Sequence, residues 1–207
     1  MVDTGMAAHR IYIDETGMNL HLSRSRGRAE AGRRAARIVC GPRGENMTVI
    51  LAISDRVGVV YHEIAWGGVN TERFRLYLEN LAVILGEEPA VLLMDNAPAH
   101  RQAEALQSHA VKKLAPHSPF LNPIENCFSV YKADLKQRLG QVQERLDDRG
   151  AALAAGYRSI GAWRKVILQE LAEQALAAVT QETVAAAYRR SNGFLGACLA
   201  REDIWAE

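Results

Sequence analysis

Residues 89–95, Pro-Ala-Val-Leu-Leu-Met-Asp, form a short apolar run that ends in a carboxylate. A run of this kind is typical of a central strand that is buried on both faces. It therefore predicts an α/β chain in which helices pack on a central sheet. The 207 residues, of which 48% are hydrophobic and 24% charged, are enough for one large domain with an appendage.

The flanking patterns predict the remaining elements of this core. Residues 10–14 alternate and are rich in β-branched and aromatic side chains, so we expect a strand that ends at Asp14. Residues 47–54 and 57–65 are two strand-like runs joined by a short turn, which predicts a hairpin. The remaining periodicities predict a strand at 110–114 and helices at 71–85, about 100–108 and 123–139. Asn70 and Thr71 are good N-caps for the first of these helices, and Gly86 ends it. The alanine-rich stretch at 160–190 is helical in character.

Three acids stand at predicted element ends. Asp14 ends the first strand, Asp95 ends the apolar strand, and Glu125 opens a helix. If the two strands are neighbours, their carboxyl ends bring both aspartates together, and the helix start adds the third acid. Such like charges repel unless a cation neutralises them, and hard oxygen ligands favour Mg²⁺ or Mn²⁺. Two such ions, roughly 4 Å apart, suit phosphodiester displacement.

Each acid also has an ordinary structural interpretation. Aspartate at a strand end often forms a turn, which applies to Asp14 and to Asp95. Glu125 follows Asn122 by three residues, and this spacing is that of a helix capping box. The set of three, rather than any one of them, indicates a metal site.

Basic residues suggest a surface for a polyanion, although the net charge is only +1. One acid, Glu30, stands among seven arginines: Arg24, Arg26, Arg28, Arg33, Arg34, Arg37 and Arg43. A solvated loop would show the same composition. On the predicted helix, Ser129, Lys132 and Lys136 share the face of Glu125. A helix face of this kind could bind a metal at one end and phosphates further along. An ordinary exposed helix face would have the same composition.

Cysteine use and hydrophobicity argue against several classes of protein. Cys40, Cys127 and Cys198 form no paired motif, which argues against a disulfide framework and a structural zinc site. No apolar run approaches the roughly 18 residues of a membrane helix, and the first residues lack the apolar stretch of a signal peptide. We therefore expect an intracellular protein, in the cytoplasm or nucleoid of a bacterium or the nucleus of a eukaryote.

Three segments together resemble the DDE superfamily endonucleases of the mariner-like transposases and their bacterial insertion-sequence relatives. They are Asp14-Glu15-Thr16, the block Asp95-Asn96-Ala97-Pro98-x-His100, and the run Leu-Ala-Pro-His-Ser-Pro-Phe-Leu-Asn-Pro-Ile-Glu-Asn at 114–126. The Asn-Pro-Ile-Glu block is highly specific, whereas the Asp-Glu-Thr triplet alone is weak. The resemblance extends from about residue 10 to residue 200.

The resemblance implies a ribonuclease-H-like (integrase-type) α/β fold: a mixed central sheet flanked by helices, with a helical C-terminal extension. We expect the catalytic core at 9–140 and the extension of the same domain at 141–207. The helix-turn-helix region that precedes the core in full-length family members has no counterpart here. The resemblance also implies that Asp14, Asp95 and Glu125 are the catalytic, metal-binding triad, with two Mg²⁺ or Mn²⁺ ions and no small-molecule cofactor.

DNA is the implied partner, as both transposon ends and target, and family members generally act as dimers. The residues expected to contact DNA or to lie behind the triad are Arg24, Arg26, Arg28, Arg33, Arg34, His100, His117, Asn122, Lys132 and Lys136. For His100, a helix cap or a hydrogen bond in the core is an equally simple interpretation.

These observations predict a Mg²⁺-dependent DNA endonuclease and strand transferase, the catalytic domain of a DDE transposase. The alternative from another class is a catalytically silent, transposon-derived domain that binds DNA or a protein. The intact triad argues against that alternative, and the missing recognition region argues for it. A different ribonuclease-H-like nuclease, such as a junction resolvase, fits the Asn-Pro-Ile-Glu block less well.

Overall fold

The computed structural model describes residues 9–18, 30–32, 46–100, 109–116 and 118–200. At its centre lies a five-stranded sheet of order β3-β2-β1-β4-β5. Its strands are β1 (His9–Met18), β2 (Met47–Ser54), β3 (Gly58–Trp66), β4 (Ala90–Met94) and β5 (Ala110–Lys113). β2 is antiparallel to both β1 and β3, whereas β4 is parallel to β1 and β5. The predicted mixed sheet and hairpin are confirmed.

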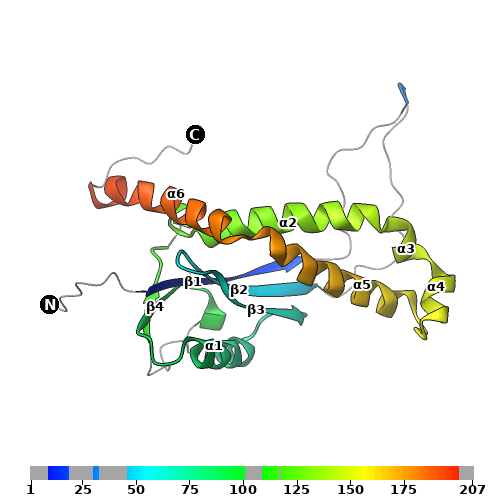
Figure 1. The fold of residues 1–207 in the computed structure, drawn as a ribbon, viewed down its shortest axis with the longest axis horizontal. Helices are drawn as coiled ribbons and strands as arrows, with labels where there is room; N and C mark the ends of the chain where they lie inside the picture. The colour runs from blue at the N-terminus through cyan, green and yellow to red at the C-terminus, as the bar shows by residue number, and fades with distance from the viewer. Residues whose placement is uncertain (1–8, 19–29, 33–45, 101–108, 117, 201–207) are drawn as a thin grey trace.

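Helices cover both faces of this sheet (Figure 1). α1 (Thr71–Leu85) lies on one face, and α2 (Ile124–Gln141), α5 (Ile160–Ala175) and α6 (Gln181–Ala200) lie on the other. The short helical elements are η1 (Pro98–His100), η3 (Pro119–Leu121), α3 (Gln143–Asp147), α4 (Arg149–Ala154) and η4 (Leu176–Ala178).

The ends of α1 follow from its sequence. The Asn70 side chain accepts a hydrogen bond from the Arg73 N–H at 2.9 Å, which satisfies one of the free donors of the first turn. Gly86 ends the helix with a φ of 62°, a conformation that glycine adopts without steric cost. Both end signals were predicted from the sequence and are confirmed.

Alternation along β1 sends successive side chains to opposite faces of the sheet. Ile11 and Ile13 pack in the core under α1, whereas Tyr12 packs in the core shared with α2, α5 and α6. By the same alternation, Asp14 belongs to the α2 face and Glu15 to the α1 face. Two neighbouring acids are thereby separated by the sheet.

The structure corrects one predicted boundary and leaves another untested. β1 does not end at Asp14 but continues to Met18, because β2 pairs with it from Tyr12 through Met18. Pairing with β4 stops earlier, at Tyr12. Of the helix predicted at 100–108, His100 ends the short η1, and residues 101–108 lie outside the described part of the chain.

Within the described segments, no helix is both long and apolar enough to cross a lipid bilayer.

Candidate active site

Asp14 lies in β1 with only 9% of its surface exposed. One carboxylate oxygen, Oδ1, accepts a hydrogen bond from the Glu15 N–H at 2.8 Å. The other, Oδ2, accepts one from the Asn122 side-chain amide, also at 2.8 Å. The second contact joins β1 to the segment before α2, across 108 residues of sequence.

The surroundings of Asp14 disfavour its ionised form. Burial is the largest cause and raises the pKa of Asp14 to about 7, although the hydrogen bond from the Glu15 N–H acts in the opposite direction. The charges of Glu15, Asp95 and Glu125 raise this pKa further. Two acids from distant parts of the sequence, together with the neighbouring Glu15, thus act electrostatically on one buried carboxyl group.

Asp95 follows directly after β4. The parallel pairing of β1 with β4 ends at Tyr12 and Leu93, two residues before Asp14 and Asp95, and the charge of Asp95 acts on Asp14. The Asp95 side chain is about half exposed (49%), and its Oδ1 accepts a hydrogen bond from the Ala97 N–H at 2.8 Å. The turn expected from the sequence is therefore present, and it leaves this carboxylate open to solvent.

Glu125 is the second residue of α2 and is exposed. The capping box suggested by the sequence is not formed as expected: the helix begins at Ile124, and the Asn122 N–H donates to the Pro119 carbonyl at 3.0 Å. The Asn122 side chain joins the helix start to the acid cluster: its amide N–H donates to Asp14 Oδ2 at 2.8 Å, and its Oδ1 accepts from the Ile124 N–H at 3.4 Å.

Sequence reasoning missed a role for Glu15. Its Oε2 lies 2.9 Å from His100 Nε2, and the other ring nitrogen of His100 lies 2.7 Å from Asp95 Oδ1. Burial lowers the pKa of His100, but the hydrogen bond and charge of Glu15 and the charge of Asp95 outweigh it, so the pKa is raised. Strand alternation could have placed Glu15 on the far face, but no sequence pattern pairs it with His100.

The residues predicted to contact DNA fall into three groups. Those outside the described part of the chain are Arg24, Arg26, Arg28, Arg33, Arg34 and His117. His100 and Asn122 are buried, with 0% and 5% exposure, which speaks against direct contact with DNA. Lys132 is half-buried and Lys136 is exposed, both on α2.

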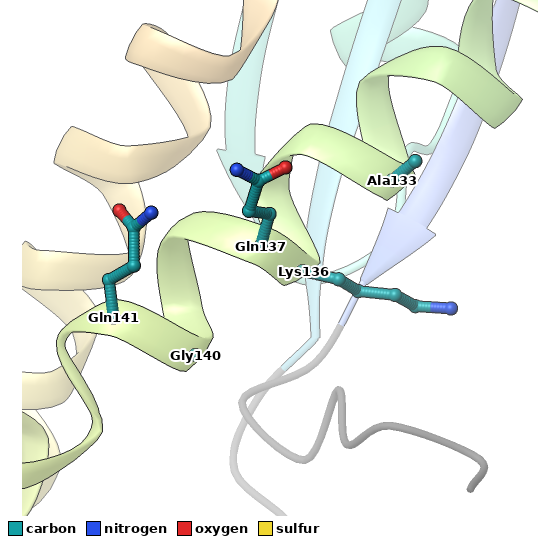
Figure 2. Close-up of a pocket in the computed structure, with 5 residues that line it drawn as sticks. All are labelled: Ala133, Lys136, Gln137, Gly140 and Gln141. Atoms are coloured by element: carbon teal, nitrogen blue, oxygen red, sulfur yellow. The ribbon is translucent and has the colours of Figure 1, made fainter.

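Lys136 lies in the C-terminal half of α2. It lines an open depression with Ala133, Gln137, Gly140 and Gln141. Figure 2 shows the Lys136 side chain extending away from those of Gln137 and Gln141. Eleven residues separate it from Glu125, which is about 16 Å along a helix. Lys136 therefore lies well away from the acids.

The donor chemistry of this cluster fits a divalent cation. All its donors are carboxylate or amide oxygens, which Mg²⁺ and Mn²⁺ prefer, and the repulsion felt at Asp14 is what a cation would relieve. Among the residues that the structure describes, no three acidic, histidine or cysteine side chains are already arranged to hold a metal. Glu125 is exposed at the start of α2, and its charge acts on Asp14.

Solved structures of the Mos1 transposase have the same fold as this chain. The Mos1 transposase paired-end complex with left transposon end matches with a TM-score of 0.62 and 20% identity, over 96% of this chain and 56% of that chain. The Mos1 strand transfer complex matches with a TM-score of 0.61 and 19% identity, over 96% of this chain and 56% of that chain. The Mos1 mariner paired-end complex with Mn matches with a TM-score of 0.59 and 19% identity, over 96% of this chain and 57% of that chain. No curated protein matches.

These likenesses make the fold ribonuclease-H-like, with a helical C-terminal region. The chain spans a little over half the length of the Mos1 transposase chain that it matches. The family model for the DDE superfamily endonucleases matches residues 9–147, which is more than half of the chain and includes Asp14, Asp95 and Glu125. The chain belongs to the DDE superfamily endonuclease family.

Proposed function

We propose that this chain is the catalytic domain of a DDE transposase, which cleaves DNA phosphodiester bonds and joins strands without a covalent protein intermediate. The observation that supports this most directly is the buried carboxyl group of Asp14, on which Asp95 and Glu125 act electrostatically from distant sequence positions. Family membership and the likeness to solved Mos1 transposase complexes agree with it. DNA ends and target are the proposed substrates.

In this proposal Asp14, Asp95 and Glu125 would hold two Mg²⁺ or Mn²⁺ ions. Bound there, the ions would supply activation of the attacking oxygen and stabilisation of the leaving oxygen. The chain's own residues prepare the ligands: Asn122 orients Asp14, and the Ala97 N–H holds one oxygen of Asp95. Because Asp95 is half exposed and Glu125 is exposed, a DNA backbone can approach the acids from solvent.

A plasmid-nicking assay with the 207-residue chain tests this function. We expect nicking in Mg²⁺ or Mn²⁺ and none in EDTA. Asp95→Asn removes a metal ligand whose contribution is several kcal/mol, so the rate should fall at least about a hundredfold. Glu182→Gln, an exposed acid in the first turn of α6, is the matched control and should nick like the unaltered protein. Equal nicking in EDTA would sink the metal-dependent mechanism.

The same experiment separates the alternatives. A silent, transposon-derived domain would bind DNA in a salt-sensitive manner and show no cleavage in either metal. A junction resolvase would cut branched DNA in preference to linear DNA. In the transposase proposal, Asp95→Asn keeps DNA binding while cleavage is lost, because the phosphate contacts that bind DNA are separate from the acids.

Metal binding gives a measurement that does not depend on cleavage. A ligand that binds only the folded state at a hundred times its Kd stabilises it by about 2.7 kcal/mol. For a chain of this size, that raises the Tm by roughly 5 to 10 °C. We expect saturating Mn²⁺ to raise the Tm of the unaltered protein and of Glu182→Gln, but to leave that of Asp95→Asn almost unchanged.

We also propose how the domain is organised and used. Residues 9–140 would form the catalytic core, and 141–207 an extension of the same domain.

Lys136 and Lys132 would contact DNA phosphates beyond the acids, so Lys136→Ala should weaken binding to all sequences alike and reduce the salt dependence by about one ion. A homodimer on paired DNA ends inside the cell is the proposed working form.

A further inference from the structure

The side chains of Glu15, His100 and Asp95 are linked by contacts that start at Glu15 on the α1 face of the sheet. His100 Nε2 lies 2.9 Å from Glu15 Oε2, and His100 Nδ1 lies 2.7 Å from Asp95 Oδ1. The ring is fully buried and packs against Phe74 of α1, with ring centroids 4.1 Å apart. Because both nitrogens face carboxylate oxygens, the ring cannot rotate without losing both contacts.

These contacts bear on only one oxygen of Asp95. The described partners of its carboxylate, the Ala97 N–H at 2.8 Å and His100 Nδ1, both lie at Oδ1. The Ala97 N–H donates to Oδ1, and His100 Nδ1 contacts the same oxygen as well as the Asp95 carbonyl oxygen at 3.3 Å, which restricts the orientation of the carboxylate and leaves its other oxygen for a further partner. In metal sites, such outer partners orient the ligands and raise metal affinity.

The backbone around His100 strengthens the arrangement. The Lys113 ammonium group of β5 donates to the His100 carbonyl at 2.8 Å, and the Asn96 amide donates to the Leu114 carbonyl at 2.8 Å. The turn that bears Asp95 is thus tied to the end of the neighbouring strand. Fixed backbone on one side and a packed ring on the other leave the Asp95 side chain little freedom.

We infer that His100 and Glu15 are positioning residues for Asp95: Glu15 fixes the ring, and the ring fixes the carboxylate. This inference rests on the proposed role of Asp95 as a metal ligand. Glu15, which follows Asp14 in β1, thereby has a role on the opposite face of the sheet from Asp14. β1 would then serve both strand aspartates, Asp14 directly and Asp95 through Glu15 and His100.

Two amide substitutions separate the two nitrogens of the ring. The amide of His100→Asn can occupy the position of Nδ1 and still donate to Asp95, whereas that of His100→Gln can occupy the position of Nε2 and face Glu15 instead. We expect His100→Gln to need about 10 to 100 times more Mn²⁺ for half of the full Tm shift, the usual effect of losing an outer partner. His100→Asn should stay closer to the unaltered protein.

The nicking assay should rank the variants of His100 in the same order by the Mn²⁺ concentration that they require, while their rates at saturating Mn²⁺ differ less. His100→Gln should shift the half-saturating Mn²⁺ concentration more than the rate at saturating Mn²⁺, because the reacting groups themselves are unchanged. His62→Gln is the matched control, since His62 also contacts a carboxylate, Glu173, at 2.9 Å, but on the α5 side of β3. It should leave the Mn²⁺ requirement unaltered.

Glu15→Gln provides a second test that leaves the ring in place. Its side chain keeps an acceptor for the ring but loses the charge, so we expect a smaller increase in the Mn²⁺ requirement. If His100→Gln does not fold, which the Tm without metal would reveal, Glu15→Gln decides alone.

The outcomes distinguish this inference from the function on which it rests. An unaltered protein that shows neither a Mn²⁺ shift nor nicking would overturn the proposed function, and the positioning role with it. An unaltered protein that shows both, alongside folded variants of His100 and Glu15 with the same Mn²⁺ requirement, would overturn the positioning role alone. Equal losses in His100→Asn and His100→Gln that follow their Tm values would also overturn it.

Discussion

The carboxyl group of Asp14 lies inside the protein beside three other acids, and this placement costs stability whenever the group is ionised. Its pKa is raised from 3.8 to about 7, so its contribution to stability is fully present below pH 4 and is lost as the pH rises through 7. Three pKa units correspond to about 4 kcal/mol. Without divalent metal, the free energy of unfolding of Asp14→Asn should therefore increase, relative to that of the unaltered protein, as the pH rises from 5 to 8.

Urea unfolding in EDTA at both pH values measures this change, and the comparison between the two proteins cancels the other titrating groups. In saturating Mn²⁺ the difference between the two proteins at pH 8 should shrink, because only the unaltered protein keeps the ligand. A stability difference that is the same at pH 5 and pH 8 would contradict the raised pKa.

The candidate acids were proposed from the sequence because each stands at a predicted element boundary within a longer motif, although β1 continues past Asp14 to Met18. What the sequence could not provide was the side-chain pairing between distant segments. The Asn122 contact with Asp14 spans 108 residues and the Glu15 contact with His100 spans 85. Such pairs depend on strand register and on which face of β1 each residue occupies, and these are properties of the folded chain.

Among the elements, η3 deserves a test because it sets the position of Asn122. Phe120 of η3 packs edge-on against Phe194 of α6, with ring centroids 5.6 Å apart. An aromatic pair of this kind contributes about 0.5 to 1.5 kcal/mol beyond its buried area. Phe194→Ala should cost roughly 1 to 2 kcal/mol and lower nicking more than this loss of folded protein explains, because η3 and Asn122 lose their support.

Leu195→Ala is the control for that variant. Leu195 is the next residue of α6 and is 41% exposed, whereas Phe194 is the residue whose ring packs against η3. Urea unfolding and nicking at a temperature where both variants are folded provide the two readings. If Phe194→Ala and Leu195→Ala nick equally well, α6 does not support the acid cluster.

Most elements were predicted because their signals are local. The period of apolar residues and the end signals at Asn70 and Gly86 gave α1, and turn residues gave the β2–β3 hairpin. The end of β1 was missed because it depends on a partner elsewhere: β1 continues to Met18 because β2 pairs with it. The break at η4 within the helical stretch 160–190 was also missed, although its signal is local: the Thr180 side chain starts a new helix by accepting from the Thr183 N–H at 3.2 Å.

At the scale of the whole molecule, the core extends beyond the segment matched by the family model. That match ends at residue 147, but one continuous core cluster joins Tyr12 of β1 to Tyr188 of α6. The Tyr188 hydroxyl lies 3.0 Å from the carbonyls of both Arg10 and Ile53, so α6 contacts β1 and β2 directly. Large buried side chains of the later segment are Trp163, Ile167, Leu168, Leu171, Val184 and Tyr188.

We therefore expect residues 1–147 alone not to fold. Each large buried side chain contributes roughly 1.5 to 3 kcal/mol, so these six together reach the 5 to 15 kcal/mol that stabilises a typical domain. Removing them also exposes the apolar face of α2 formed by Tyr131, Leu135 and Leu139. Circular dichroism and urea titration of 1–147 beside 1–200 would decide: a single cooperative transition for 1–200 and none for 1–147 is the expected result. Cooperative unfolding of 1–147 would mean that the C-terminal helices are an accessory layer, and Phe194 could then affect the acids only weakly.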